Sequence, residues 1–363
     1  MISIVIPTFN EVNNIIPLLK NLIHILKDFH YEIIVVDDDS PDGTSEEVNK
    51  YKKFNNNIKL ITRIGRSGLA SAIKEGLLFA EGSYLLVLDG DGQHDASCIL
   101  NMINLIVSSK ADLIIGSRFL NTSRLEGLSN KRSLGSKIAN KLARFSLPKN
   151  YVLITDYLSG CFCLNRKTTK LLIKKIEING FKFLYELLSL SNGKLLIKEI
   201  PLLFKERTFG DSKLDLAIIW DFIISIFHNL TFRIMPRRAI SFGLVGMSGV
   251  FVQLFMTSLL TTIFKIDFYN ALPFAVICAA TSNFIINNQV TFRSNRLKNL
   301  SLLVGLLKFL LVASLPVIAN VGITSAFYKY ISADTFIAQI AGIAIVYAWN
   351  YLASSSFVWN NSN

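Results

Sequence analysis

The stretch YLLVLDGDGQHD, from Tyr84 to Asp95, decides how the rest of the chain is interpreted. Its first five residues form a short apolar run of the kind that predicts a buried strand. Three oxygen-bearing side chains then follow at alternate positions: Asp89, Asp91 and Gln93. The positions between them are glycines, which let a ligand approach the backbone closely. The stretch therefore predicts a strand that ends in closely spaced carboxylates.

Carboxylate and amide oxygens at the end of a strand favour a divalent metal. In an open α/β sheet, ligands bind at the carboxyl ends of the strands, and Mg²⁺ is commonly held by one or two carboxylates together with substrate phosphates. We therefore expect Mg²⁺ or Mn²⁺ at Asp89, Asp91 and Gln93, where the ion would clamp a diphosphate and neutralise it as it departs. A strand followed by a polar turn has the same pattern, so the rest of the chain must decide.

The composition narrows the class of protein. The chain has 363 residues, of which 51% are hydrophobic, and a formal net charge of +12. The length suits about two domains, and a basic, apolar chain indicates an anionic membrane surface or a phosphate-rich ligand as partner. The basic residues form no continuous stripe, which disfavours a nucleic-acid partner. The four cysteines form no Cys-x-x-Cys pair, which disfavours a zinc site or a disulfide framework.

Strands and helices alternate through the first half of the chain. Apolar runs that predict buried strands lie at Ile2–Pro7, Tyr31–Asp38, Ile58–Arg63, Tyr84–Leu88 and Ala111–Arg118. That alternation predicts a doubly wound, Rossmann-like and mostly parallel sheet. The first strand is followed by no Gly-x-Gly-x-x-Gly segment, and the chain has no Walker A sequence. Both absences disfavour the usual dinucleotide-binding and P-loop folds.

Each of these strands ends in polar residues, which we expect to gather at one rim of the sheet. The set comprises Glu11, Asp37, Asp38, Asp39, Asp89, Asp91 and Arg118. A rim with this many carboxylates would repel a bare nucleotide phosphate. A metal ion and basic side chains therefore have to offset the negative charge. The basic candidates are Arg63, Arg66, Arg118, Arg132, Arg207 and Lys213.

Seven motifs follow one another in this half of the chain: IPTFNE (Ile6–Glu11), VVDDDSPDGT (Val35–Thr44), R-x-x-R-x-GLA (Arg63–Ala70), LDGDGQH (Leu88–His94), GSRF (Gly116–Phe119), D-x-x-SG (Asp156–Gly160) and R-x-x-G-x-SK (Arg207–Lys213). In this order and spacing the set resembles the family 2 glycosyltransferases of the GT-A type. It is most similar to their dolichol-phosphate mannosyltransferase branch and its bacterial polyprenyl-phosphate relatives. The resemblance covers Ile2 to about Asp215.

The resemblance implies roles for single residues. The nucleotide base and ribose would be held by Pro7, Phe9, Glu11, Val36 and Asp38. The donor diphosphate and its metal would bind at Asp89, Gly90, Asp91 and Gln93. The acceptor phosphate would be received by Arg118, Arg132 and Ser136, and the donor diphosphate would be covered by Arg207 and Lys213. The resemblance thus makes the catalytic residues Asp91, Arg118 and Arg132.

A few positions depart from the family pattern. Phe9 stands where the family often has Tyr, which keeps a stacking face but loses a hydroxyl, and Gly90 replaces the usual Ala. Asp39 stands where Asn or Gly is common. These departures remove no proposed ligand, but they leave the base and the sugar open.

Several candidates also have a plain structural interpretation. Glu11 could support the first helix, Asp37 and Asp39 could shape the turn after the second strand, and a lone histidine such as His94 beside a turn is usually structural. Asp156 could likewise belong to a simple turn.

The chemistry needs no strong base if the acceptor is a phosphate monoester. Its second pKa is near ~6, so it is mostly ionised and nucleophilic at neutral pH. Catalysis then consists of positioning and charge stabilisation. Guanidinium groups match phosphate oxygens bidentately, which suits Arg118 and Arg132 to orient the acceptor. The resemblance implies a single in-line displacement that inverts the anomeric centre.

The second half of the chain is predominantly apolar. Leu214–Met235 is amphipathic and suits a helix in the membrane interface or an ordinary packing helix. Four apolar spans follow, at 239–264, 269–286, 302–328 and 334–353, each near the ~20 residues that cross a bilayer. Basic residues precede the first span and follow the second. The positive-inside rule therefore places the catalytic domain and both termini in the cytoplasm.

The membrane half contains an internal repeat. NFIINNQVTF (Asn283–Phe292) matches NYLASSSFVW (Asn350–Trp359), and FGLVGMSGV (Phe242–Val250) matches FLLVASLPV (Phe309–Val317), both at the same offset. This half resembles the GtrA-like family of four-helix membrane proteins, which implies either a plain anchor or a part in moving polyprenyl-linked sugars. Asn283, Asn287, Asn288 and Gln289 would line a lipid-phosphate path or pair between helices.

The sequence thus predicts an α/β GT-A catalytic domain at 1–213, an amphipathic interfacial segment at 214–238 and an all-α transmembrane domain of four helices at 239–363. The predicted activity is transfer of mannose from GDP-mannose to a polyprenyl or dolichyl phosphate at the cytoplasmic membrane face. UDP-glucose is the alternative donor.

Two other functions are weighed against this prediction. A processive polysaccharide synthase is disfavoured, because no tryptophan stands in a Gln-x-x-Arg-Trp motif. A protein that binds or translocates polyprenyl-linked sugars is the alternative of another class. The intact donor-site residues argue against it: Asp89, Asp91, Arg207 and Lys213. The sequence leaves open whether the chain forms a homo-oligomer.

Overall fold

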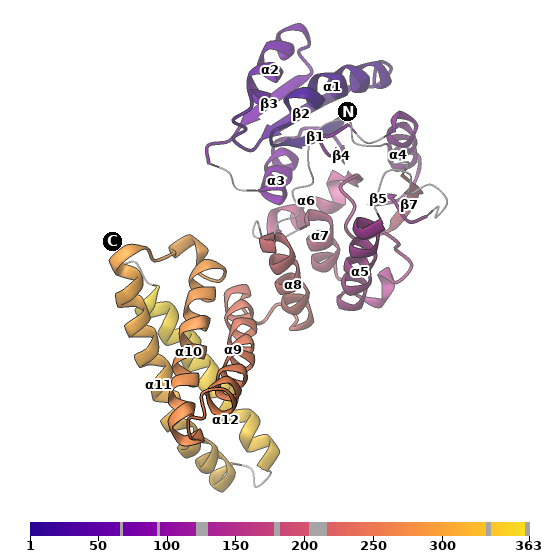
Figure 1. Ribbon diagram of the computed structural model, residues 1–363. Helices are drawn as coiled ribbons and strands as arrows, with labels where there is room; N and C mark the ends of the chain where they lie inside the picture. The colour runs from indigo at the N-terminus through magenta and orange to yellow at the C-terminus, as the bar shows by residue number, and fades with distance from the viewer. Residues whose placement is uncertain are drawn as a thin grey trace. The chain divides into compact units, whose positions relative to one another are not determined.

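The computed structural model describes residues 1–65, 68–92, 95–120, 130–177, 182–202, 216–331 and 335–359. The chain forms two compact units, Met1–Leu230 and Thr231–Asn363, which are coloured along the chain in Figure 1. The predicted segment 214–238 spans the boundary between them, and its separation from the catalytic domain stays a prediction.

A seven-stranded sheet forms the centre of the first unit, with strand order β3-β2-β1-β4-β6-β5-β7. In chain order its strands are β1 (Ile2–Thr8), β2 (Tyr31–Asp37), β3 (Ile58–Thr62), β4 (Tyr84–Val87), β5 (Leu113–Ser117), β6 (Phe162–Asn165) and β7 (Ile197–Pro201). The five predicted strands are all present, and β1 pairs in parallel with both β2 and β4.

The sheet differs from the prediction on its second half. The sequence predicted neither β6 nor β7, and β6 runs antiparallel to β4 and to β5. The short run FCLN of β6 contains no β-branched residue to favour a strand, and β7 is a half-exposed edge strand without a continuous apolar run. The sheet is therefore mixed, although its other pairings are parallel.

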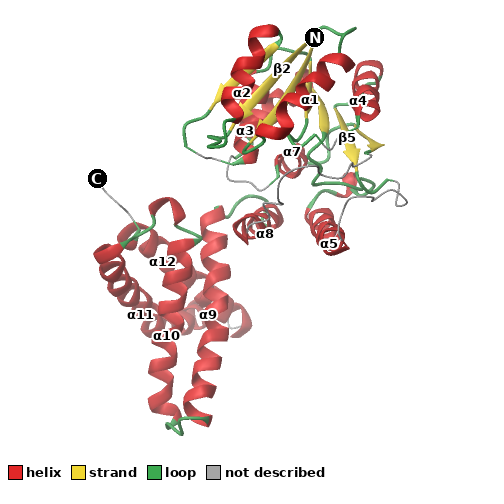
Figure 2. Ribbon diagram, turned by 45° about the horizontal axis from the view of Figure 1, so that its top comes forward, coloured by secondary structure: helices red, strands yellow, loops and turns green. Residues whose placement is uncertain are grey.

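Helices cover both faces of the sheet, as Figure 2 shows. The core on one face includes residues of α1 (Val12–Ile25), α2 (Thr44–Tyr51) and α4 (Ala96–Ser108). The core on the other includes residues of α3 (Leu69–Phe79), α5 (Asn130–Ser146), α6 (Arg166–Lys175), α7 (Phe183–Ser191) and α8 (Leu216–Leu230). Two short 3₁₀ turns lie at Lys52–Phe54 and Lys149–Tyr151.

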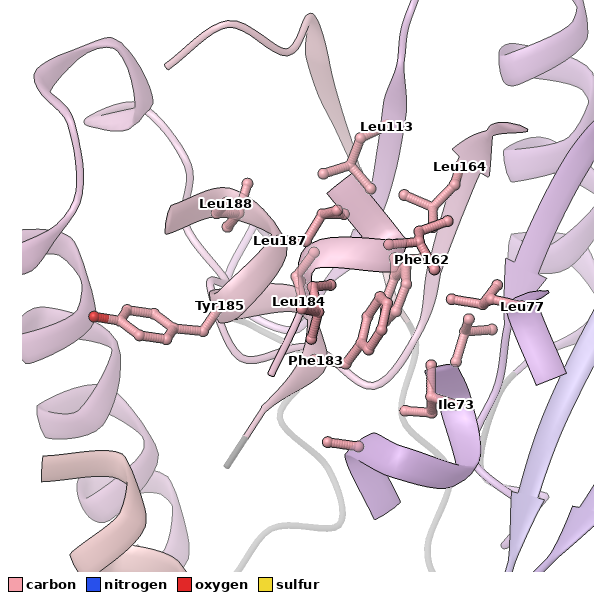
Figure 3. Close-up of a cluster of buried hydrophobic side chains, with 14 of the residues drawn as sticks. Ile73, Leu77, Leu113, Phe162, Leu164, Phe183, Leu184, Tyr185, Leu187 and Leu188 are labelled. Atoms are coloured by element: carbon pink, nitrogen blue, oxygen red, sulfur yellow. The ribbon is translucent and has the colours of Figure 1, made fainter. Parts of the chain in front are cut away.

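Alternate residues of each central strand enter opposite cores. In β1, Ile4 and Ile6 belong to the first core and Val5 to the second, and all three are fully buried. A strand buried on both faces reads as a continuous apolar run, which is why periodicity alone identified β1. In the second core, Phe162 of β6 stacks on Phe183 of α7 with ring centroids 5.9 Å apart, as Figure 3 shows.

Helix α8 packs onto this second core. Phe222 meets Tyr185 of α7 edge-on, with ring centroids 5.7 Å apart. Ser189 Oγ donates to Asn229 Oδ1 at 2.6 Å, and the Asn229 amide donates to the carbonyl of Ser146 in α5. The helix that was predicted as interfacial or packing therefore has one face buried in the first unit.

The second unit is helical where it is described. Its helices are α9 (Arg237–Thr262), α10 (Phe268–Gln289), α11 (Asn299–Tyr330) and α12 (Thr335–Ala353), with a 3₁₀ turn at Arg293–Asn295 and a π-helical turn at Ser354–Val358. Two helices of the described chain, α9 and α10, combine the length and apolar composition that a bilayer crossing needs. The prediction of four spans stays a prediction for α11 and α12.

The two copies of the internal repeat contact each other through equivalent aromatic residues. Phe292 and Trp359 hold the same place in the two copies, and their rings stack with centroids 4.1 Å apart. Asn288 ties these ends together, because its Oδ1 accepts from Leu297 N at 2.8 Å and from Trp359 Nε1 at 3.0 Å. Asn288 thus pairs within the helical unit, one of the two roles predicted for it.

We expect Gly76→Ala to destabilise the catalytic unit, although alanine is the better helix former. A Cβ at Gly76 of α3 would lie 2.4 Å from Val5 Cγ1 and 2.9 Å from Val36 Cγ2. These β-branched side chains are stiff, so overpacking should cost about 1–3 kcal/mol. Thermal melting of the full chain in detergent should show a lower Tm for this variant.

Gly135→Ala is the matched control, because a Cβ there meets no described atom within 4 Å. It should leave Tm unchanged or raise it. A Gly76→Ala protein as stable as the parent would contradict the close packing of α3 on β1 and β2.

Candidate functional site

The ends of β1 and β4 meet at the rim of the sheet through Gly90. A Cβ at this position would lie 3.1 Å from Thr8 Cγ2, 3.2 Å from the carbonyl of Pro7 and 3.6 Å from Glu11 Cγ. The close approach leaves little room for a side chain larger than that of alanine. The predicted donor residues Pro7, Glu11 and Gly90 are therefore neighbours, and the half-buried Phe9 lies in the same loop.

The Asp89 carboxylate lies directly against the segment that precedes β6. A Cβ on Gly160 would fall 2.2 Å from Asp89 Oδ2, so only glycine fits between them. Asp91, two residues on, is half-buried in the turn after β4, and Gly92 has a φ of +69° in the left-handed region that favours glycine. The sequence stretch that decided the fold is thus packed against the Asp156–Gly160 motif.

The two acids at the end of β2 have different surroundings. The Asp37 carboxylate is fully buried and accepts hydrogen bonds from Thr8 Oγ1, Ser40 Oγ and Ser45 Oγ at 2.6–2.9 Å. It therefore shapes the turn, one of the two interpretations of this residue.

Asp38 is held from two sides. Its Oδ1 accepts from Arg63 Nη1 at 2.7 Å, and its Oδ2 accepts from Gly68 N at 2.8 Å. Asp38 is buried, so these two hydrogen bonds fix its carboxylate at the end of β2. Val36, in contrast, is fully buried with its side chain directed at α3.

Arg118 is fixed at the end of β5 by a two-point ion pair. Its Nε donates to Asp156 Oδ2 at 2.7 Å and its Nη2 donates to Asp156 Oδ1 at 2.8 Å. The Arg118 side chain is 17% exposed and that of Asp156 is 0% exposed. Burial acts to lower the pKa of Arg118, but the charge and hydrogen bonds of Asp156 outweigh it and raise this pKa. The guanidinium has five N–H groups, so the ion pair leaves three for an anion.

A second cation lies near the same carboxylates and was missed by sequence reasoning. Lys182 is half-buried at the N-terminus of α7. Burial lowers its pKa, while the negative charges of Asp89, Asp156 and Asp91 act in the opposite direction. Nothing in the FKFLYELL stretch distinguishes Lys182 from an ordinary solvated lysine, so only the fold identifies it.

Of the other predicted site residues, the structure describes only some. Ser136 lies half-exposed in the first turns of α5, where its carbonyl accepts from Asn140 Nδ2 at 3.0 Å. Arg132 belongs to the same helix, but its side chain lies outside the described part of the chain. Gln93, His94, Arg207 and Lys213 also lie outside the described residues.

The chemistry of the rim suits a hard divalent cation. Asp89 and Asp91 supply carboxylate oxygens, which together with substrate phosphates form a common Mg²⁺ environment. Among the residues described, which omit Gln93 and His94, no group of three His, Cys, Asp or Glu side chains is gathered as metal ligands. A metal here would therefore depend on the two carboxylates and on oxygens from the substrate or Gln93.

Comparison with known families matches both halves of the chain. Residues 3–169 match the model of glycosyl transferase family 2, and residues 241–359 match the model of the GtrA/DPMS transmembrane domain.

Relatives extend the match to the whole length. A dolichol-phosphate mannosyltransferase of Pyrococcus furiosus is 30% identical over 361 residues, which cover 99% of either chain. A dolichol-phosphate mannosyltransferase of Saccharomyces cerevisiae is 27% identical over 66% of this chain and 91% of its own. Among solved structures, a mannosyltransferase from Pyrobaculum calidifontis in complex with GDP-Man and Mn²⁺ aligns with a TM-score of 0.46 and 13% identity, covering 99% of this chain and 88% of the other.

The two family models and the full-length Pyrococcus furiosus relative agree with the resemblance that the seven motifs indicated. The chain therefore belongs to the family 2 glycosyltransferases that carry a GtrA/DPMS transmembrane domain, and it is a membrane glycosyltransferase similar to dolichol-phosphate mannosyltransferases.

Proposed function

We propose that the protein transfers mannose from GDP-mannose to a polyprenyl or dolichyl phosphate. The observation that carries the proposal is the half-buried Arg118, fixed by Asp156 next to the Asp89 carboxylate with N–H groups left for an anion. A charged acceptor phosphate needs such a group, whereas a sugar hydroxyl does not. Full-length similarity to a dolichol-phosphate mannosyltransferase supports the same acceptor and sugar.

The acceptor phosphate would act as its own nucleophile. It is mostly ionised at neutral pH because its second pKa is near ~6, so no side chain has to remove a proton. Arg118, with Arg132 and Ser136, would orient one phosphate oxygen toward the anomeric carbon. Attack from the face opposite the leaving diphosphate gives one displacement with inversion, and the chain's part is positioning and charge stabilisation.

The donor would lie across the ends of β1, β2 and β4. Phe9 would stack on the base, while Pro7, Glu11 and Asp38 would enclose the base and ribose. Val36, whose side chain faces α3, would contribute only backbone atoms. Asp89, Gly90 and Asp91 would face the diphosphate. Arg207 and Lys213 would cover the diphosphate and stabilise its charge as the bond to the sugar breaks.

Asp89, Asp91 and Gln93 would hold Mg²⁺ or Mn²⁺, which supplies Lewis-acid stabilisation of the departing diphosphate. The carboxylates cannot do this alone, because they would repel the diphosphate. The positive charge of Lys182 offsets part of the negative charge of these carboxylates.

The membrane half would keep the enzyme beside its lipid acceptor. Four transmembrane helices with cytoplasmic catalytic domain and termini remain our proposal, because the basic residues flank the same membrane side. Residues 1–213 would form the catalytic domain, 214–238 the interfacial segment and 239–363 the membrane domain.

A donor panel tests the reaction. Purified protein in detergent should transfer label to polyprenyl phosphate from GDP-mannose, and Asp91→Asn should abolish most of the transfer because one metal ligand loses its charge. UDP-glucose and UDP-N-acetylglucosamine would be offered separately, and the metal removed by EDTA and restored as Mg²⁺ or Mn²⁺. Transfer of label from UDP-glucose alone would show that UDP-glucose, and not GDP-mannose, is the donor. If no donor supports transfer although nucleotide still binds, the result would favour a translocation function.

The role of Arg118 is tested by Arg118→Lys. Lysine keeps the charge but cannot make the two-point pair with Asp156 and still present a planar fork. Loss of a hydrogen bond to a charged group costs about 1.5–3 kcal/mol, so KM for polyprenyl phosphate should rise about tenfold or more, with nucleotide affinity unchanged. Lys141→Gln, an exposed position on α5, is the control. Equal loss of acceptor and nucleotide affinity would contradict an acceptor role for Arg118.

A further inference from the structure

The carboxylate of Glu199 in β7 accepts several hydrogen bonds from the segment Thr155–Asp156, which holds Arg118. Its Oε2 accepts from Thr155 N at 2.9 Å and from Thr155 Oγ1 at 3.1 Å, and its Oε1 accepts from Asp156 N at 3.1 Å. One carboxylate thus binds two consecutive backbone N–H groups and a hydroxyl. The Thr155–Asp156 turn can therefore shift little while Glu199 is in place.

The same turn is fixed to the strand that carries Arg118. Ser117 Oγ and Thr155 Oγ1 lie 2.6 Å apart, and Arg118 N donates to Asp156 Oδ2 at 3.2 Å. Strands β5 and β7 are parallel, with Ile115 opposite Glu199, and Leu202 N donates to the carbonyl of Ser117 at 2.8 Å. Glu199 and Arg118 are consequently attached to neighbouring strands, with Asp156 as the link between them.

The arrangement is costly for a purely structural connection. Burial raises the pKa of Glu199 above its ordinary value, although the N–H groups of Thr155 and Asp156 and the Thr155 hydroxyl favour the ionised form. A second carboxylate, Asp156, lies close by and adds to the rise. Ionisable groups whose pKa is shifted by burial and by a like charge are concentrated at functional sites. Here the energetic cost of placing Glu199 beside Asp156 is accompanied by a fixed direction of the Arg118 guanidinium.

We propose that Glu199 is a positioning residue for the acceptor site: it fixes the Thr155–Asp156 turn, and through Asp156 it sets the direction in which Arg118 presents its remaining N–H groups to the acceptor phosphate. The inference rests on the proposed function. It adds a residue that touches neither substrate and lies outside the seven motifs. A displacement of about 1 Å in a positioning group can cost on the order of 10²-fold in rate, so small movements of the turn matter.

The test is Glu199→Gln in the full-length protein in detergent. Glutamine has the same size, but its amide NH₂ would face a backbone N–H at one of the two positions, so the turn must move. We expect KM for polyprenyl phosphate to rise about tenfold, while the affinity for GDP, measured by titration, stays within about twofold and Tm changes little. Lys198→Gln, an exposed neighbour on the same strand, should change neither KM nor Tm.

A double-mutant cycle with Arg118→Lys separates this inference from the proposed function. If Glu199 acts through Arg118, Glu199→Gln should add no further rise in acceptor KM in the Arg118→Lys background. Additive effects would overturn the inference. If Arg118→Lys itself leaves the acceptor KM unchanged, the proposed acceptor role fails instead. If Arg118→Lys raises it and Glu199→Gln does not, the positioning role alone fails.

Thr155→Val provides a second variant should Glu199→Gln not fold. Valine removes the hydroxyl contacts of Thr155 with Glu199 and Ser117 but leaves the Glu199 carboxylate and the two backbone N–H donors. A smaller rise in acceptor KM, with unchanged GDP affinity, is expected. A loss of Tm with equal losses of GDP and acceptor affinity would show a structural role and overturn the inference.

Discussion

The ion pair of Arg118 with Asp156 is the interaction on which the rim depends. The carboxylates of Asp89, Asp91 and Asp156 all act to raise the pKa of Lys182, so the three negative charges surround one lysine. Like charges at short range in a partly buried site are costly, so fixed cations are needed before any substrate arrives. Because Arg118 is paired at 2.7 and 2.8 Å, it balances the charge and stays rigid. A flexible lysine at this place would balance the charge but would not stay rigid.

The mixed sheet explains how this pair can form. Strand β6 runs antiparallel between β4 and β5, so the segment that enters β6 starts at the same rim at which β4 and β5 end. That reversal brings Asp156 to Arg118 and Gly160 to Asp89. A wholly parallel sheet would deliver the start of this strand to the opposite edge. The antiparallel strand is therefore a functional part of the fold.

The sequence predicts the parts of the molecule in which local pattern and burial agree. The apolar runs of β1, β2 and β4 are continuous because both faces of these strands are covered. The internal repeat, whose copies are 359 − 292 = 67 residues apart, predicted equivalent places for Phe292 and Trp359, and their rings stack. Strand β6 escaped prediction because its short run contains no β-branched residue, and β7 escaped because it is half-exposed. Glu199 and Lys182 escaped because their partners are distant in sequence, and no local pattern encodes a long-range contact.

In the proposed reaction a phosphate monoester held by Arg118, and not a hydroxyl group, attacks the sugar. The most direct measurement offers polyprenyl phosphate and the matching unphosphorylated polyprenol to the same enzyme with the same labelled nucleotide-sugar. We predict label only in the phosphate-linked lipid, with the anomeric configuration of the sugar inverted. Label transferred to polyprenol at a comparable rate, or a product with retained configuration, would contradict the account.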